Sequence, residues 1–322
     1  MAHTHELLGI SNAIVDILAH VDHDFIAKLE SPPGSMTLID AKQARALYAQ
    51  LGPTTEMSGG SVGNSVATFA LLGGSAAYIG RVADDQFGEV FAHDMTSLGV
   101  ALALPPETRE APTARSHVMI TPDGQRTMQT YLGACTEIET NDIRSDTVGV
   151  PAAVLIEGYI FDTPHGPEAV DKLLDMVAAH DTAVALSLSD PFCVDRHRSA
   201  FKSKIGRSIN VAIGNESEFA ALFETDDHGE IFDAATRSGA LCVMTRSADG
   251  AIAVDGDEVY EIAAEPVEKV LDTTGAGDAF AGGFLHEWVR SGDIDAAGRL
   301  AARCAAAVIQ QVGARLPPGI LT

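Results

Sequence analysis

The segment "LDTTGAGDAFAGGFLHEW", residues 271–288, changes from an extended pattern to a helical one around two glycines. Gly275 and Gly277 fall in the expected first turn of that helix, although glycine weakens a helix by about 1 kcal/mol relative to alanine. Thr273 and Thr274 already offer a capping hydroxyl, so capping alone does not require the glycines. Free backbone N–H groups at the start of a helix, with no Cβ atoms in the way, are typical of an anion-binding site.

Asp278 follows these glycines directly. Its carboxylate either complements the helix dipole or acts as a general base beside N–H groups that hold a transferring phosphoryl group. The segment lacks the third glycine of a dinucleotide-binding fingerprint and lies near the C-terminus. The chain has no G-x-x-x-x-G-K-[ST] P-loop, and "HEWVR" at 286–290 lacks the second histidine of a zinc-protease motif. The pattern therefore favours a phosphoryl-transfer role for Asp278.

Composition limits the classes of protein to be considered. The 322 residues are 46% hydrophobic and 20% charged, which allows a sizeable core and disfavours disorder. A formal net charge of −24 disfavours nucleic acid and anionic membrane surfaces as partners. The four cysteines form no C-x-x-C pair, which excludes a disulfide framework and a zinc knuckle. Without a signal-peptide pattern or an apolar run of about 20 residues, we expect a cytoplasmic protein with no membrane partner.

Short apolar segments alternate with helical periodicity along most of the chain, as in "AVLIEGYIF", "GPEAVDKLLDMVAAHD" and "TAVALSLSD". This alternation predicts an α/β fold with a mostly parallel sheet covered on both faces. Two segments, about 14–58 and 110–133, break the rhythm, and the second alternates with period two around the turn "TPDGQ". We predict that both are β insertions, which together form a small lid on a single domain spanning residues 1–322.

A second junction of glycines with a helix lies in "MSGGSVGNSVATFALLGG". Gly59 and Gly60 precede the expected helix, and Asn64 lies in its first turn. An ordinary capped junction and a ligand-binding loop are both compatible with this pattern. Asp16, in "GISNAIVDIL", follows a strand and a turn, so it is either a turn carboxylate or a ligand-binding one.

Asn215 and Glu218 are spaced as N-x-x-E at the start of the predicted helix "ESEFAALF". The spacing is that of a capping box, and it could also position a hydrated magnesium ion. Spacing alone favours the cap. Arg126, just beyond the "PDG" turn, could clamp a phosphate, although an exposed arginine beside a hairpin is more common.

Taken together, these motifs resemble a known family. "DTTGAGDAFAGGF" resembles the C-terminal signature of the ribokinase-like (PfkB) carbohydrate kinases, and "GGSVGNSVATFALLGGSAAYIGRVADDQFGE" resembles their N-terminal signature. "N-x-x-E" fits their magnesium motif, and the three occur in the expected order over essentially the whole chain. Within the family, "GISNAIVDILAHVDHDFIAK", "LSLSDPF" and "IGNESEFAALF" are most similar to adenosine kinases. The resemblance implies a three-layer αβα ribokinase-like domain with a small β lid.

The resemblance also implies roles for individual residues. The backbone of Gly275, Ala276 and Gly277 would bind the γ-phosphate of ATP. Asp278 would deprotonate the primary 5′-hydroxyl of a nucleoside, and the resemblance to adenosine kinases implies that this nucleoside is adenosine. The residues implied in substrate binding are Asp16, Gly60 and Asn64 for the ribose and Phe192 and Tyr159 for the base. Ordinary core packing is an equal alternative for the two aromatic residues.

The implied cofactors are ATP and Mg²⁺, and a monovalent cation such as K⁺ is left open. Glu218 and Asn215 would hold the magnesium ion through water, and Arg126 would assist. The adenine side of ATP is expected near "TRSADG", with Thr245 and Gly250. Tyr131 departs from the family pattern, because a smaller polar residue is expected in this segment, which would line the nucleoside pocket.

Three functions are compatible with these residues. The first is a nucleoside kinase, and the second is a sugar kinase of the same family acting on ribose, fructose or a related carbohydrate. The third, a non-catalytic nucleotide-binding regulator, is disfavoured because the candidate base and the magnesium motif are both present. The lid strands could be covered by solvent, by ligand or by a partner's lid. The expected oligomeric state is therefore either a monomer or a homodimer formed through the lid.

Overall fold

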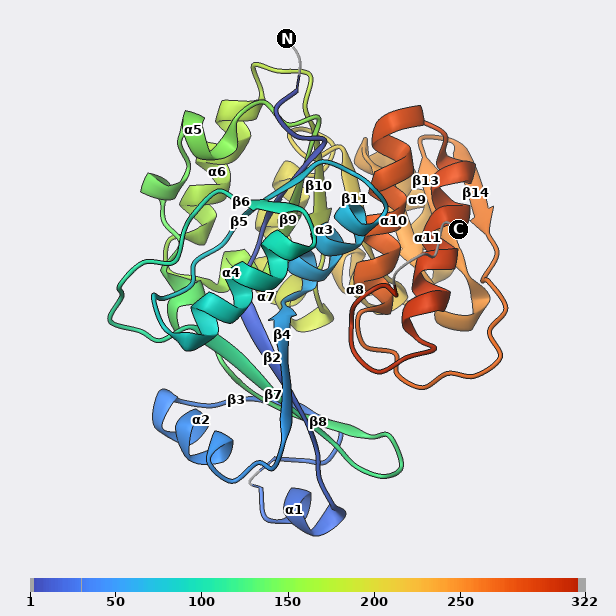
Figure 1. Cartoon of the computed structure of the whole chain (residues 1–322). Helices are drawn as coiled ribbons and strands as arrows, with labels where there is room; N and C mark the ends of the chain where they lie inside the picture. The colour runs from blue at the N-terminus through green and yellow to red at the C-terminus, as the bar shows by residue number, and fades with distance from the viewer. Residues whose placement is uncertain (1–2, 30, 318–322) are drawn as a thin grey trace.

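The main body of the molecule is built on one large twisted sheet (Figure 1). The computed structural model describes residues 3–29 and 31–317. The nine strands lie in the order β14-β13-β12-β11-β10-β9-β1-β5-β6. They are β1 (Leu7–Ile10), β5 (Ala76–Ile79), β6 (Val100–Leu102), β9 (Ala153–Glu157), β10 (Ala183–Ser187), β11 (Val211–Asn215), β12 (Leu241–Thr245), β13 (Ala251–Asp255) and β14 (Glu258–Ile262). From β6 to β12 neighbouring strands are parallel, and only β13 and β14 pair antiparallel.

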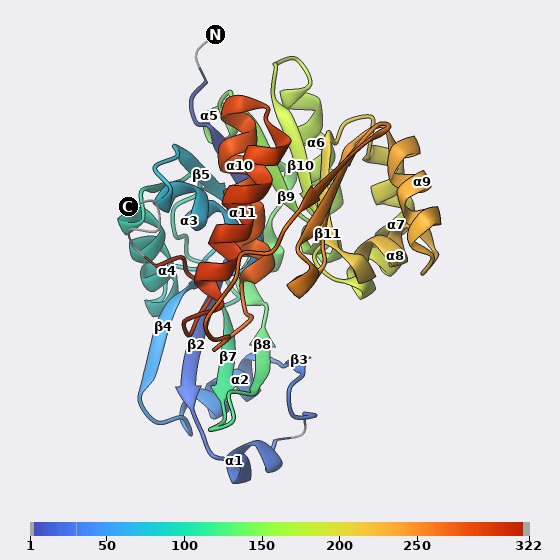
Figure 2. The same cartoon turned by 90° about the vertical axis from the view of Figure 1, so that its right-hand side faces the viewer.

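Helices cover both faces of this sheet (Figures 1 and 2). One layer contains α3 (Ser61–Leu71), α4 (Gln86–Ser97), α10 (Ala276–Ser291) and α11 (Ile294–Val308). The other contains α5 (Ser145–Val148), α6 (Gly166–Val177), α7 (Pro191–Lys204), α8 (Glu216–Phe223) and α9 (His228–Ser238). Successive strand residues point to opposite faces, so Leu7 belongs to the first layer's core and Leu8 to the second's. The predicted α/β class with a mostly parallel, doubly covered sheet is confirmed.

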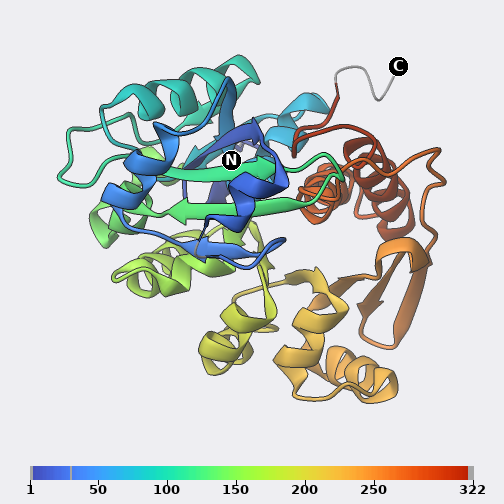
Figure 3. The ribbon, with the colours of Figure 1, turned by 90° about the horizontal axis from the view of Figure 1, so that it is seen from below.

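A second sheet of five strands lies below the main body in Figure 1, in the order β3-β8-β7-β2-β4. Its strands are β2 (Ile14–His20), β3 (Met36–Leu38), β4 (Thr54–Gly59), β7 (Ala114–Ile120) and β8 (Arg126–Tyr131). All five come from the two segments that break the strand–helix rhythm. The first segment also forms two helices that the sequence analysis did not predict, α1 (His23–Ala27) and α2 (Ala41–Tyr48). Figure 3, seen from the side of the second sheet, shows its blue and green strands over only part of the molecule.

The predicted strand "AVLIEGYIF" is shorter than expected. β9 ends at Glu157, and the chain continues as the 3₁₀ helix η3 (Gly158–Asp162). The reason is that pairing with β1 ends at Ile156 and pairing with β10 ends at Glu157. Beyond that point the backbone has no ladder partner, and it forms local hydrogen bonds instead. Tyr159 therefore lies on a turn of helix and not on a strand.

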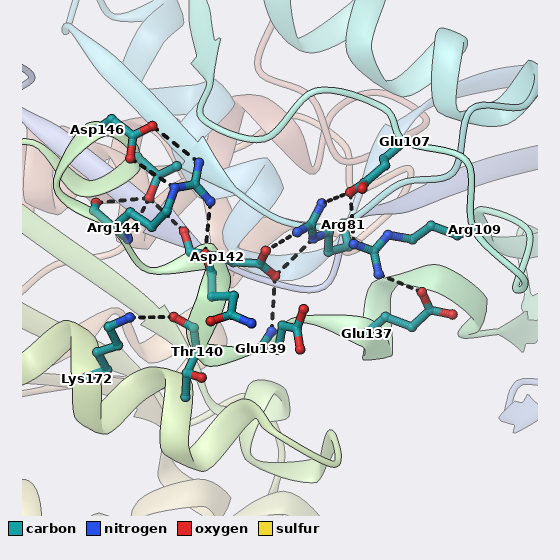
Figure 4. Close-up of polar contacts among 12 residues, drawn as sticks. Arg81, Glu107, Arg109, Glu137, Glu139, Thr140, Asp142, Arg144, Asp146 and Lys172 are labelled. Atoms are coloured by element: carbon teal, nitrogen blue, oxygen red, sulfur yellow. Dashed lines mark hydrogen bonds and ion pairs between the residues drawn. The ribbon is translucent and has the colours of Figure 1, made fainter.

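A chain of ion pairs joins the segment after β5 to the segment after β8 (Figure 4). Arg81 forms ion pairs with the fully buried Asp142 and, at 2.6 Å, with Glu107. Arg109 contacts Glu107 at 3.0 Å and Glu137 at 2.8 Å. Glu137 and Asp142 lie on two short 3₁₀ helices, η1 (Gly133–Glu137) and η2 (Thr140–Asp142). Because a buried carboxylate is strongly destabilising without a cation, Arg81 ties these helices to the main sheet.

Two further expectations concern the whole chain. All four cysteines are free and buried, in keeping with the absence of a predicted disulfide framework. Of the helices formed by residues 3–29 and 31–317, none is both long and apolar enough to span a membrane.

Candidate active site

The candidate site lies where the carboxyl ends of the parallel strands face the second sheet (Figure 1). β1 leads directly into β2 of the second sheet, and the ends of β9, β10, β11 and β12 lie along the same edge. In open α/β sheets, ligands bind outside this edge. The first turn of α10 adds a helix N-terminus to it.

The two glycines at the start of α10 are glycine for different structural reasons. Gly275 has φ +77°, and a Cβ on it would lie 2.5 Å from the Cβ of Ala314, so both conformation and packing require glycine. A Cβ on Gly277 would meet no atom of the described residues within 4 Å. Packing therefore does not explain Gly277, whereas the approach of a ligand to its backbone would.

The Asp278 carboxylate is held by two side chains from the first turn of α3. Ser61 Oγ donates to Asp278 Oδ1 at 2.7 Å, and Asn64 Nδ2 donates to Asp278 Oδ2 at 2.9 Å. Burial raises the pKa of Asp278, and the two hydrogen bonds and Arg315 oppose the rise. The fold thus joins the acid of one predicted motif to the asparagine of the other, 214 residues away in sequence.

Asp16 lies on β2 beside the glycines that precede α3. A Cβ on Gly59 would come within 2.4 Å of Asp16 Oδ2, and one on Gly60, at φ +84°, would lie 2.5 Å from the carbonyl oxygen of Asn12. Only glycine allows these close approaches. Burial raises the pKa of Asp16 to about 6, with an opposing effect of Arg315 and a further rise caused by Asp278. Asp16, Gly60 and Asn64 therefore converge near Asp278.

Arg315 is a charged residue of this site that the sequence analysis missed. Its Nη1 donates to Asn64 Oδ1 at 2.7 Å, and its Nη2 bonds the carbonyl oxygen and Oγ of Ser58. The side chain is only 14% exposed, and Asp94 lies 3.9 Å away. Because Arg315 occupies Asn64 Oδ1, the Nδ2 group of that amide is directed to Asp278. A lone arginine near the C-terminus has no local pattern that could have identified it.

Glu157, at the end of β9, is a second residue that the sequence analysis missed. It is 1% exposed and accepts hydrogen bonds from Ser11 Oγ and, at 3.1 Å, from the backbone N–H of Val62. The backbone N–H of Asn12 donates to it at 3.4 Å. An acid at the end of an otherwise apolar strand was the available signal. Glu157 holds the β1–β2 turn against the start of α3.

Protonation of Glu157 leads to a prediction about stability. Burial raises its pKa to about 7 from an ordinary 4.5, so the folded state binds more protons than the unfolded state between these values. The free energy of unfolding should therefore fall as pH rises from 5 to 8, by on the order of 1 to 3 kcal/mol for this group. Glu157→Gln should flatten this slope in melting temperatures measured across the range.

Glu168→Gln is the matched control, because Glu168 is exposed in the first turn of α6. Burial also raises the pKa of Asp16 and of Glu218, so part of the slope should persist in Glu157→Gln. A Glu157→Gln protein with the full wild-type slope would contradict the assignment.

Asn215 and Glu218 form the capping box that their spacing favoured. Asn215 Oδ1 accepts from the N–H of Glu218 at 2.9 Å, and Glu218 Oε2 accepts from the N–H of Asn215 at 3.0 Å. Glu218 is nevertheless buried, and burial raises its pKa to about 7, with smaller contributions from Asp190 and Asp278. Within residues 3–29 and 31–317, no three His, Cys, Asp or Glu side chains gather as a metal site. A magnesium ion here would take most of its ligands from water and phosphate.

Arg126 is not the exposed hairpin arginine that its position in the sequence suggested. It extends from β8 of the second sheet and forms an ion pair with Asp272. It also donates to Thr274 Oγ1 at 2.8 Å. Asp272 in turn accepts from the backbone N–H groups of Thr274 and Gly313, at 3.0 and 2.8 Å. Arg126 thus links the second sheet to the turn that precedes α10.

The two candidate aromatic residues lie in different surroundings. Tyr159 packs against the core, and its hydroxyl donates to Asp190 Oδ2 at 2.5 Å. Phe192, in the first turn of α7, is 73% exposed. Core packing therefore accounts for part of the Tyr159 surface, but it does not account for Phe192.

Thr245 and Gly250 belong to the β12–β13 hairpin. Thr245 pairs with Asn215 across the parallel β11–β12 ladder, and its Oγ1 donates to the carbonyl oxygen of Gly214 at 3.4 Å. Gly250 has φ +82°, and a Cβ on it would lie 2.0 Å from the carbonyl oxygen of Ile262. The turn itself therefore requires this glycine. Thr245 is next to the Asn215 cap, whereas Gly250 lies in the turn beyond it.

The sequence profile described as "pfkB family carbohydrate kinase" matches residues 35–319. The chain belongs to this family. Its overall fold is shared with solved structures. The adenosine kinase from Sinorhizobium meliloti is 39% identical, covers 98% of this chain and 97% of its own, and has a TM-score of 0.90.

Other relatives of the same family differ in the substrate that their names state. A probable sugar kinase from Rhizobium etli is 37% identical, with 99% of this chain and 97% of that chain covered and a TM-score of 0.91. Adenosine kinase 1 from Arabidopsis thaliana is 28% identical over 97% of this chain and 96% of its own length. The predicted resemblance to PfkB kinases, with adenosine kinases among the relatives, is confirmed.

Proposed function

We propose that the protein is an ATP-dependent nucleoside kinase that phosphorylates the 5′-hydroxyl of adenosine. The observation that carries this proposal is the Asp278 carboxylate, which Ser61 and Asn64 hold beside the open backbone of Gly277. A carboxylate next to a helix N-terminus pairs a base with an anion site, which is what phosphoryl transfer to an alcohol requires. The adenosine kinase relatives support the choice of acceptor.

In this proposal the protein's own groups have the following roles. Asp278 accepts the proton of the acceptor hydroxyl as that oxygen attacks in line. The N–H groups of Gly275, Ala276 and Gly277 stabilise charge on the transferring phosphoryl group. Asp16 and Asn64 bind the ribose hydroxyls, and Gly60 allows the sugar to approach the backbone. The exposed ring of Phe192 and the ring of Tyr159 would offer flat surfaces to the base.

Magnesium and ATP fit the other end of the site. Glu218 and Asn215 offer oxygen atoms at the end of β11, which suit a hard cation bound through water. Such an ion neutralises phosphate charge when bound. Arg126 lies beside the turn before α10, and Thr245 and Gly250 mark the hairpin proposed for the adenine of ATP.

The second sheet serves, in this proposal, as the lid of a single kinase domain. Its contact with the turn before α10 through Arg126 and Asp272 supports the assignment. A lid that closes over the sugar excludes water and thereby limits hydrolysis of ATP.

A sugar kinase is the second candidate, and the relative from Rhizobium etli favours it. The two are separated by ADP production from Mg-ATP with adenosine, guanosine, inosine, ribose and fructose. We expect the largest kcat/KM with adenosine. Activity with a free sugar alone would retain the Asp278 chemistry and contradict the nucleoside assignment. If each of the five acceptors gives the same ADP production as a reaction without any acceptor, the result would contradict kinase activity toward all five compounds.

A further inference from the structure

A separate pocket of about 230 Å³ lies between the second sheet and the main body. α2 contributes Arg45 and Tyr48 to its wall, and β7 contributes Arg115. The main body contributes Asp85, Gln86 and Phe87, at the start of α4. The pocket therefore has two arginines on one side and a helix N-terminus on the other.

This pocket lies on the opposite face of the second sheet from the candidate active site. In the parallel β2–β7 ladder, Asp16 is paired with Ser116 and Val15 with Arg115. Paired residues point to the same face, and successive residues point to opposite faces. Arg115 thus points away from the face that presents Asp16. The ring of Tyr131, paired with Arg115 in the β7–β8 ladder, lies against it and not in the expected nucleoside pocket.

Arg115 is a buried cation that forms no ion pair with a described residue, although the carboxylate of Asp85 lies near enough to attract it. The residue as a whole is 5% exposed, and its guanidinium carbon lies 5.3 Å from the ring centres of both Phe87 and Tyr131. Nε has no acceptor among the described residues, and Nη1 has only a 3.5 Å contact with the carbonyl oxygen of Thr113. No described carboxylate forms an ion pair with it. Since a guanidinium has five N–H donors and stays charged at neutral pH, this arginine, which lines the pocket, retains unused donors.

The remaining polar groups of the pocket leave room for an anion. The carboxylate of Asp85 accepts from the N–H of Gly88 and from the N–H of Thr113, each at 2.9 Å, and it also attracts Arg115, so the two arginines must outweigh its negative charge for an anion to bind. Arg45 is exposed and forms no ion pair with a described residue. The N–H groups of Gln86 and Phe87 lie in the first turn of a twelve-residue helix, where no intrahelical acceptor exists.

We propose that this pocket is a second, non-catalytic binding site for a phosphate group, either inorganic phosphate or a small phosphate monoester. Two guanidinium groups and a helix N-terminus form the set of donors that oxyanions bind. The pocket is several times the roughly 30 Å³ that one water occupies in the liquid, which leaves space for a small organic group beside the rings of Tyr48 and Phe87. Because its walls come from both parts of the molecule, an occupant would bridge the second sheet and the main body.

The test is isothermal titration calorimetry of the full chain with inorganic phosphate and with phenyl phosphate. Arg45→Gln and Arg115→Gln should each weaken binding at least about tenfold, as expected for the loss of one charge-assisted hydrogen bond. Arg237→Gln is the matched control, because Arg237 is an exposed arginine on α9. Tighter binding of phenyl phosphate than of phosphate would support a monoester as the ligand, and equal binding would support free phosphate.

Wild-type affinity in both Arg45→Gln and Arg115→Gln would overturn the proposal, since the anion would then bind elsewhere, for example at the turn before α10. The absence of binding up to about 10 mM, which corresponds to a negligible affinity, would also overturn it. If Arg115→Gln does not fold, the affinity of Arg45→Gln for phosphate decides the test alone, because Arg45 is exposed and its substitution should leave the fold intact. As a second readout, phosphate should slow hydrogen exchange at residues 41–48 and 86–88 in the wild-type protein and not in Arg45→Gln.

Discussion

Asp278→Ala should lower kcat by two to four orders of magnitude, the usual effect of removing a general base, while the protein remains folded. The carboxylate is buried in a setting that raises its pKa, which means that the folded state does not favour its charge. The melting temperature should therefore stay unchanged or rise, because removal of an unfavourably buried active-site carboxylate offsets the loss of its hydrogen bonds. Steady-state ADP production and thermal unfolding of the same preparations measure both quantities.

Glu89→Ala is the matched control for this experiment. Glu89 is an exposed acid in the first turn of α4, so it shares only the helix-dipole role with Asp278. Its removal should cost about 0.3 to 1 kcal/mol of stability and leave kcat unchanged. If Asp278→Ala behaves like Glu89→Ala, Asp278 merely complements a dipole, and the proposed mechanism fails at its central step.

Arg315→Met should lower kcat/KM by about 10- to 100-fold and move the acidic limb of the pH–rate profile upward by about one unit. The guanidinium attracts both carboxylates of the site and so lowers the pKa of Asp16 and of Asp278. Without it, both carboxyl groups keep their protons to a higher pH. The base form of Asp278 is then less populated at neutral pH.

Arg315→Lys separates the charge of Arg315 from its positioning role. Lysine retains the charge, so the pH–rate profile should stay close to that of the wild type. It lacks the planar guanidinium that contacts Asn64 and Ser58 together, so KM should rise because Asn64 is no longer oriented. A purely structural arginine would lower the melting temperature in both variants without moving the pH profile or raising KM, and that result would exclude both the charge effect and the positioning role.

The fold class was predictable because burial on both faces leaves a mark in the sequence. β1, β5 and β9 are buried along their whole length, so they appear as short apolar runs between amphipathic helices. The two segments of the second sheet were recognised because they interrupt the strand–helix rhythm, and the second also because it alternates with period two around "TPDGQ". α1 and α2 were not predicted, because they are short and their burial depends on contacts with the second sheet, as for Ile26 and Leu47 against Met119.

Candidate site residues were predictable where glycine accompanied them. Gly275 and Gly60 have positive φ angles and leave no space for a Cβ, and this need is written into the local sequence next to Asp278 and Asn64. Glu157 and Arg315 have no such companion pattern. Their importance comes from contacts with residues far away in the chain, which a local motif does not record.

The sequence by itself determined the αβα layering, the two glycine–helix junctions, the capping box of Asn215 and Glu218 and the membership of a kinase family, because each depends on local periodicity or on a short motif. The tertiary structure decided that Asp278 meets Ser61 and Asn64, that Arg315 orients that asparagine, that Arg126 pairs with Asp272, and that Arg115 is buried without an ion pair to any described residue. These contacts depend on how the sheets and helices pack together, and a side chain's neighbours in space are set by the whole chain.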